Sequence, residues 1–124
     1  MSEELRGVVV CHGPLAAALV QSAEQISGLS GALIAVSNTG CDREALEDRV
    51  IAAVNGHPAV VFVDLPSGSC LVAVLKRLRS EQLVKVVTGV NLAMLVDFVF
   101  HRSLSPAEAA GRAAAAGEKS IKVP

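Results

Sequence analysis

The sequence predicts an α/β fold: an open, doubly wound sheet of four parallel strands with helices on both faces, and an added edge strand at the C-terminal end. Four short Val-rich segments are apolar at successive positions, which is typical of parallel strands covered on both faces. They are residues 5–11, 32–36, 59–64 and 84–88. Segments with helical periodicity separate them, so the crossovers would place helices on both sides of the sheet. The 124 residues fit one domain spanning residues 1–124, and 52% hydrophobic residues are enough for a substantial core.

The first two helices are each predicted to follow a strand. The first has Gly13 as its expected N-cap, Pro14 at its first position and Gly28 at its end. Its inward face is expected to comprise Leu15, Leu19, Ser22 and Ile26. Asp42 is expected to cap the second helix, which runs to Gly56. Its inward face is expected to comprise Leu46, Val50 and Ala53.

The third and fourth helices show the same amphipathic spacing. The third presents an apolar face of Leu71, Leu75 and Leu78, and a solvated basic face of Lys76, Arg77 and Arg79. Asn91 is a candidate cap for the fourth helix, whose apolar face is expected to comprise Leu92, Leu95, Val96 and Val99.

The C-terminal region predicts a fifth helix followed by a strand. Ser105, Pro106 and Glu108 form a capping box with proline in the first turn, and the Ala-rich helix is expected to end at Gly117. The segment Lys119–Val123 alternates polar and apolar residues, a pattern that favours an edge strand.

Composition excludes several classes of partner. A net charge of -1 gives no broad attraction to nucleic acid or to an anionic membrane, and 2% aromatic residues leave almost no platform for base stacking. The apolar runs are interrupted before they reach the length of a membrane span. Three cysteines without C-x-x-C spacing argue against a disulfide framework and against a zinc site. We therefore expect a cytoplasmic protein without a metal or cofactor and without membrane insertion.

The polar side chains are concentrated where the predicted strands end. His12 follows the first strand and Asp64 follows the third. In a flavodoxin-like strand order these two strands are neighbours, so the two side chains are expected to meet. A carboxylate that accepts a hydrogen bond from Nδ1 would fix the ring tautomer and leave Nε2 with its lone pair. The adjacent helix N-terminus disfavours an imidazolium, which favours a neutral, nucleophilic ring.

Helix starts beside these two residues favour an anionic ligand. Backbone N–H groups at helix N-termini bind phosphate, and serine hydroxyls add donors. The candidate phosphoryl-binding residues are Gly13, Ser67, Gly68 and Ser69, and the expected rim of the site comprises Asn38, Thr39 and Asn91. The residues thus predict a histidine, His12, that accepts a phosphoryl group and is held by Asp64.

Each of these residues also has a structural interpretation. A histidine at a strand end is often only solvated, and Asp64 before a turn can serve as a capping residue. His57 and His101 are interpreted as a solvated loop residue and as a favourable group at a helix C-terminus. Cys11 is expected to point away from His12 because strand neighbours face opposite sides. Cys70 is of interest because a helix N-terminus can lower the pKa of a thiol.

Three blocks of the sequence, in order, resemble the EIIA domains of the mannose/fructose/sorbose family in the bacterial phosphoenolpyruvate-dependent sugar phosphotransferase system. They are GVVVCHGPLAAALVQSAEQISG, VVFVDLPSGSCLVAVLKRL and VVTGVNLAMLVDFV. The sequence departs from the family pattern at Pro66-Ser67-Gly68, where a Gly-Gly turn is usual, and at Cys70 and Ala93, where proline is usual.

The resemblance implies a phosphotransferase that works through a phosphohistidine. His12 would be phosphorylated by the phosphocarrier protein HPr, Asp64 would orient it, and Ser69 would contact the phosphoryl group. The resemblance also implies a homodimer in which Lys119–Val123 is exchanged between subunits, and an EIIB acceptor on a separate chain.

Alternative functions remain open at this point. The same phosphorylation could report phosphotransferase flux to a regulatory target, or the domain could be a degenerate, non-catalytic binding module. The phosphotransfer subunit of dihydroxyacetone kinases is a third possibility, disfavoured because the His-Gly and Gly-Val-Asn-Leu motifs are more similar to those of the sugar type.

Overall fold

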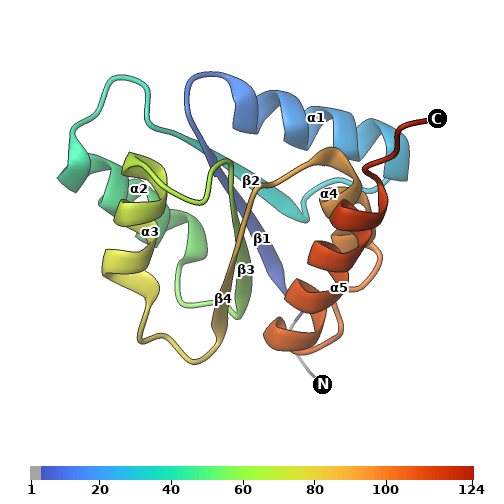
Figure 1. Ribbon diagram of the computed structural model, residues 1–124. Helices are drawn as coiled ribbons and strands as arrows, with labels where there is room; N and C mark the ends of the chain where they lie inside the picture. Colours follow the sequence, from blue (N-terminus) through green and yellow to red (C-terminus); the bar gives the residue numbers. More distant parts are fainter. Residues whose placement is uncertain (1–3) are drawn as a thin grey trace.

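The structure is a computed structural model that describes residues 4–124, and it contains one four-stranded sheet (Figure 1). The strands are β1 (Arg6–Cys11), β2 (Leu33–Ser37), β3 (Ala59–Val63) and β4 (Val84–Thr88). All pairings are parallel, and the order is β2-β1-β3-β4. The predicted four-stranded α/β fold is thus confirmed, including the placement of β1 next to β3.

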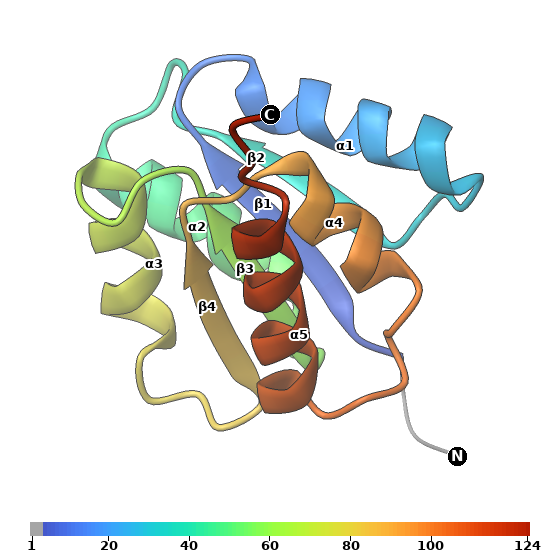
Figure 2. The same ribbon diagram turned by 45° about the vertical axis from the view of Figure 1, so that its right-hand side comes forward.

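Five helices cover the sheet on both faces. They are α1 (Leu15–Ser27), α2 (Arg43–Val54), α3 (Ser69–Leu78), α4 (Leu92–Val99) and α5 (Pro106–Lys119). Helices α1, α4 and α5 pack on one face, and α2 and α3 pack on the other (Figures 1 and 2). Within residues 4–124, no helix is both long enough and apolar enough to cross a membrane.

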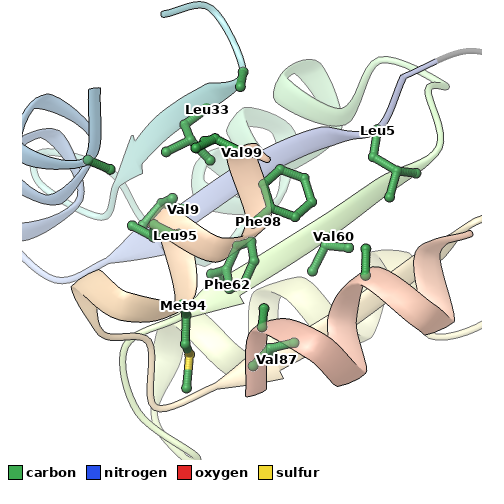
Figure 3. Close-up of a cluster of buried hydrophobic side chains, with 14 of the residues drawn as sticks. Leu5, Val9, Leu33, Val60, Phe62, Val87, Met94, Leu95, Phe98 and Val99 are labelled. Atoms are coloured by element: carbon green, nitrogen blue, oxygen red, sulfur yellow. The ribbon is translucent and has the colours of Figure 1, made fainter. Parts of the chain in front are cut away.

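The two faces of the sheet have different cores. Under α1, α4 and α5, the rings of Phe62 and Phe98 meet edge to face with centroids 5.4 Å apart, and leucines and valines surround them (Figure 3). Under α2 and α3 the core contains valine side chains from all four strands and from both helices. β1 and β3 contribute to both cores in alternation, which explains why their segments are apolar at successive positions.

The strand register brings the ends of β1 and β3 together. Val10 pairs with Val63, and the backbone N–H of Asp64 donates to the carbonyl of Val10 at 3.3 Å. On the other side of β1, Cys11 pairs with Ser37. The segments that leave β1, β2 and β3 therefore emerge at one edge of the sheet.

Helix α1 differs from its prediction in two ways. It begins at Leu15 with Pro14 as its N-cap residue, one position later than expected, because Gly13 takes a positive φ of 60° in the turn before it. Its buried residues are Ala16 and Ala23, with Leu19 and Val20 packed beside them. Leu15 and Ile26, which were predicted to face inward, are exposed, so the prediction was wrong for these two residues.

Local capping signals are confirmed at three helices. The side chains of Asp42, Asn91 and Ser105 each accept the N–H three residues ahead, at the starts of α2, α4 and α5. The inward face of α2 is also confirmed, since Leu46, Val50 and Ala53 are buried. In α4, the predicted Leu95 and Val99 are buried, together with the unpredicted Met94 and Phe98.

The predictions for α3 and for the C-terminus need correction. Leu78 is buried in α3 as expected, and Leu71 packs against the core while only partly buried. The other buried residues are Cys70, Ala73 and Val74, and not Leu75. Helix α5 does not end at Gly117 but continues through Lys119, because the small glycine lies within its packed face. In the single chain the residues after Ser120 form no strand, so most of the predicted edge strand is unpaired here.

Candidate functional site

One carboxylate oxygen of Asp64 holds His12 at two points. Oδ2 accepts the backbone N–H of His12 at 2.8 Å, and it lies 2.7 Å from the Nδ1 atom of the same residue. The parallel register of β1 and β3 places both residues just beyond the sheet, which is why they meet although 52 positions separate them. The predicted pairing of His12 with Asp64 is confirmed as a geometric fact.

The environment of Asp64 stabilises its ionised form. Its side chain is only 9% exposed, and this burial on its own raises the pKa. The hydrogen bonds from the backbone and ring of His12, the charge of His12 and the bond from Leu65 N to Oδ1 act in the opposite direction. Together they outweigh burial and lower the pKa of Asp64 below the ordinary value of an aspartate.

An ionised carboxylate beside Nδ1 determines which ring nitrogen is available for chemistry. Since a carboxylate only accepts, Nδ1 carries the proton, and in the neutral ring the lone pair is on Nε2. The His12 side chain is 42% exposed, and Ser69 Oγ lies 3.4 Å from Nε2. The arrangement therefore places Nε2 of a partly exposed ring next to a serine hydroxyl.

The N-terminus of α3 approaches the same ring. Gly68 precedes the helix with a φ of 96°, and a Cβ atom at this position would lie 3.9 Å from Cε1 of His12. No side-chain hydrogen bond caps α3, and its first intrahelical bond runs from Val72 N to Gly68 O. The first N–H groups of a helix have no partner within the helix, so this end can bind an anion beside Nε2. Ser67 is exposed in the preceding turn.

The segment after β2 clamps the turn that follows His12. Asn38 Oδ1 accepts the N–H of Gly13 at 3.0 Å, so this N–H is already used and is not a free phosphate donor as the sequence suggested. Ser37 Oγ donates to Gly13 O at 2.7 Å and lies 3.0 Å from Thr39 Oγ1. Asn38 therefore supports the turn that carries His12, and it also lines a surface hollow together with Ser69. Thr39 is exposed beside Ser37.

Two supporting residues escaped the sequence analysis. Ser37 reaches the His12 turn directly, and Arg49 holds the loop by donating to the carbonyls of Ser37 and Thr39 at 2.8 and 3.0 Å. A serine directly after the predicted strand 32–36 was the available signal for Ser37. The role of Arg49 depends on how α2 packs beside the loop, and no local pattern indicates it.

Asn91 takes a structural position. Its Oδ1 accepts Met94 N at 3.1 Å, and its Nδ2 donates to Gly117 O at 3.1 Å. The side chain therefore joins the start of α4 to the end of α5, and the prediction that it contributes to the rim of the site does not match these contacts.

The cysteines differ in their relation to His12. Cys11 lies in the core beneath α1, α4 and α5, and burial raises its pKa to about 12. Cys70 Sγ lies 3.7 Å from His12 Nδ1. Burial raises the pKa of Cys70 to about 11, so the lowering expected from its place at a helix N-terminus does not occur. The ligand atoms of His12, Asp64 and Cys70 all lie within 4.8 Å of one another.

Solved structures share this fold. A phosphotransferase system component EIIA from Streptococcus agalactiae superimposes with a TM-score of 0.88 at 18% identity, with 96% of each chain covered. A mannose/sorbose-specific IIA subunit of the phosphotransferase system from Enterococcus faecalis gives 0.85 at 18% identity, covering 98% of this chain and 96% of that one. A sigma-54 interaction domain protein from Enterococcus faecalis gives 0.77 at 13% identity, covering 97% and 95%. A search of curated proteins found no match.

The sequence itself matches a family model. The EIIA-man model, described as the PTS system fructose IIA component, matches residues 7–115, a span that includes the segments carrying His12, Asp64 and Ser69. The match covers most of the chain, and the architecture agrees with that of the solved IIA proteins. The protein therefore belongs to the EIIA-man family of phosphotransferase system components.

Proposed function

We propose that Nε2 of His12 accepts a phosphoryl group from phosphorylated HPr, and that the protein passes it to an EIIB-type acceptor on a separate chain during sugar uptake. The observation that carries this proposal is the 2.7 Å contact between Nδ1 and Asp64 Oδ2, because in the neutral, partly exposed ring it leaves the lone pair on Nε2. Family membership supports the reaction class, since EIIA proteins are phosphotransfer components of the system.

The proposed step is a displacement at phosphorus. The Nε2 lone pair forms a bond to phosphorus while the bond between phosphorus and the donor breaks, and the bonding electrons leave with the donor. The ring keeps its Nδ1 proton and gains positive charge. The lowered pKa of Asp64 keeps its carboxylate ionised, so it can stabilise that charge and hold the ring in line.

The start of α3 is proposed to receive the phosphoryl oxygens. The uncapped N-terminus offers backbone N–H groups, and Ser69 Oγ, 3.4 Å from Nε2, can turn its proton toward a phosphoryl oxygen. Gly68 supports this role because its positive φ lets the backbone turn in beside His12 without a side chain between the helix and the ring.

We also propose that the active form is a homodimer in the cytoplasm, with the C-terminal tail exchanged between subunits. The argument rests on the resemblance and on the apolar side chains of the tail. Ile121 is 74% exposed and Val123 is 98% exposed in the single chain. A neighbouring subunit's sheet edge would bury both and would pair the tail backbone.

A second candidate function is regulation by the same phosphorylation. The specific observation in its favour is the fold shared with a sigma-54 interaction domain protein. In this role the phosphorylated His12 would report phosphotransferase flux to a target protein. A phosphohistidine that transfers to HPr and back but to no EIIB protein would favour this alternative.

The test is reconstitution with phosphoenolpyruvate, enzyme I and HPr, followed by mapping of the phosphate under non-acidic conditions, because phosphohistidine is acid-labile. We expect one phosphoryl group on His12, with no label in His12→Ala and unchanged label in His57→Ala. Label that persists in His12→Ala would refute the assignment. Absence of label in the wild-type protein would favour the degenerate binding module.

A further inference from the structure

Cys70 is a buried thiol at the candidate site to which the proposed phosphotransfer gives no role. Its Sγ atom lies 3.7 Å from His12 Nδ1, on the side of the ring that also faces Asp64. Three different ligand types, an imidazole nitrogen, a carboxylate oxygen and a thiol sulfur, thus converge from three separate segments of the chain. Borderline divalent cations such as Zn²⁺ prefer mixed sets of this kind.

The separation of Sγ and Nδ1 fits a tetrahedral cation, whereas the contact between Nδ1 and Oδ2 is too short for one. Zn–S bonds of about 2.3 Å and Zn–N bonds of about 2.0–2.1 Å place sulfur and nitrogen ligands about 3.5–3.6 Å apart. The observed separation of Sγ and Nδ1 is 3.7 Å. The 2.7 Å contact of Nδ1 with Asp64 Oδ2 would have to lengthen by about half an ångström once a cation replaces the shared proton.

We propose that His12, Asp64 and Cys70 form a three-ligand site for a divalent cation of the Zn²⁺ class, and that occupation of this site and phosphorylation of His12 exclude one another. The fourth position of the cation is filled by water, as in open zinc sites. The cation binds through Nδ1, Oδ2 and Sγ.

Metal binding and phosphorylation of His12 exclude one another because metal binding moves the protons of the ligands. The thiol proton of Cys70 leaves to solvent as the Zn–S bond forms. The Nδ1 proton of His12 moves to Nε2 as the Zn–N bond forms, with solvent as the carrier. The metal-bound ring then carries a proton on Nε2, so the nitrogen that would attack phosphorus has no lone pair. Asp64 changes from an acceptor of the Nδ1 proton to a metal ligand.

The metal site stands on geometry alone, whereas the exclusion also rests on the proposed function. The experiment therefore begins with binding, in the absence of any phosphotransfer protein. Co²⁺ is titrated into the reduced protein as a spectroscopic probe for Zn²⁺. We expect one equivalent to bind, with thiolate-to-cobalt charge-transfer absorption in the near ultraviolet and release of the cobalt on addition of Zn²⁺.

Matched serine variants identify the sulfur. Cys70→Ser should lose the charge-transfer absorption and bind at least about tenfold more weakly. Cys41→Ser should behave like the wild type, because the Cys41 thiol faces the carbonyl of Asn38 at 3.3 Å. Charge-transfer absorption retained in a folded Cys70→Ser protein, or absent from the wild type, would overturn the proposal. If Cys70→Ser does not fold, imidazole ¹⁵N shifts of the wild-type protein decide: Zn²⁺ should convert His12 to the Nε2–H tautomer, and an unchanged ring refutes the site.

The second part of the experiment measures the exclusion. One equivalent of Zn²⁺ should abolish phosphorylation of the wild-type protein by phospho-HPr but leave Cys70→Ser active at the same Zn²⁺ concentration. If Co²⁺ binds with charge-transfer absorption but Zn²⁺ does not inhibit phosphorylation, the mutual exclusion is refuted and the metal site stands. Cobalt binding in a protein that is never phosphorylated would refute the proposed function without refuting the site.

Discussion

Asp64 accepts both the backbone N–H and the ring Nδ1 of His12 with a single oxygen atom, at 2.8 and 2.7 Å. Its other oxygen accepts Leu65 N at 3.0 Å. The carboxylate is thus surrounded by donors at both oxygens, and no neutral amide can reproduce this pattern, because one of its two ends is itself a donor.

Asp64→Asn tests this relationship. Whichever way the amide turns, its NH₂ group meets a donor, either Leu65 N or the two donors of His12. We expect the variant to fold, to lose about 1–3 kcal/mol of unfolding free energy in urea, and to accept phosphate about 10-fold more slowly or worse. The exposed Asp48→Asn is the control, with a change within about 0.5 kcal/mol. Wild-type kinetics in Asp64→Asn would assign the orienting role to another group.

The pH dependence of stability gives an independent prediction. The native pKa of Asp64 is lowered, so in acid the unfolded chain binds a proton at this residue before the folded chain does. The stabilising contribution of Asp64 is therefore complete above the ordinary aspartate pKa and is lost as the pH falls from about 5 toward the lowered native value. In urea titrations the stability difference between wild type and Asp64→Asn should shrink over this range. A difference that stays constant down to pH 3 would contradict the lowered pKa.

Two glycines in α5 form a matched pair. A Cβ atom on Gly117 would lie 2.5 Å from Met94 Cγ and 3.1 Å from Asn91 Oδ1, whereas one on Gly111 would meet nothing within 4 Å. Gly117→Ala should cost about 1–3 kcal/mol through overpacking, and Gly111→Ala should stabilise by up to about 1 kcal/mol through helix propensity. Urea denaturation checks both values. Equal effects at the two positions would show that α5 does not pack closely against the start of α4.

Variants of Asn38 and Asn91 distinguish a residue that supports the candidate site from one that supports only the fold. Asn38→Ala removes the acceptor of Gly13 N beside His12, so phosphoryl transfer should slow severalfold. Asn91→Ala removes the cap of α4 and the bond to Gly117 O, so it should cost about 0.5–2 kcal/mol with an unchanged transfer rate. Transfer rates and urea midpoints measured on both variants check this division, and a slow but stable Asn91→Ala would place Asn91 at the site after all.

Removal of residues 121–124 tests the proposed dimer. Truncation after Ser120 keeps the last turn of α5, where Ser120 Oγ donates to Gly117 O at 2.7 Å. We expect the full chain to sediment as a dimer at micromolar concentration and the truncated chain to dissociate more readily, because Ile121 and Val123 are then missing from the exchanged strand. A monomeric full chain, or a truncated chain that dimerises as tightly, would contradict the exchange.

The sequence indicated the fold and the central pair because both depend on simple rules. Parallel strands bury both faces, which makes them recognisable as apolar runs. Their carboxyl ends meet at one edge of the sheet, so the sequence alone allowed His12 to be paired with Asp64. Capping by Asp42, Asn91 and Ser105 is local chemistry over three residues, and it was also predictable.

The errors occurred where tertiary packing decides. In α1 the buried positions are Ala16 and Ala23, since small residues let the helix approach the sheet closely, and large apolar residues such as Ile26 remain outside. The basic face of α3 is exposed as predicted, but its ion pairs were not foreseen: Lys76 and Arg77 reach the buried Glu47 of α2 at 3.6 and 3.7 Å. The position of Cys70 beside the His12 ring likewise depends on how α3 docks, which no local pattern encodes.

The central claim is that Nε2 of His12 is the phosphoacceptor while Asp64 holds Nδ1. The most direct measurement is long-range ¹H–¹⁵N NMR of the protein, labelled with ¹⁵N in its histidines, before and after phosphorylation by phospho-HPr. We expect the phosphate on Nε2 of His12, with the proton still on Nδ1. Phosphate on Nδ1, on His57 or on His101, or no phosphorylation at all, would contradict the account.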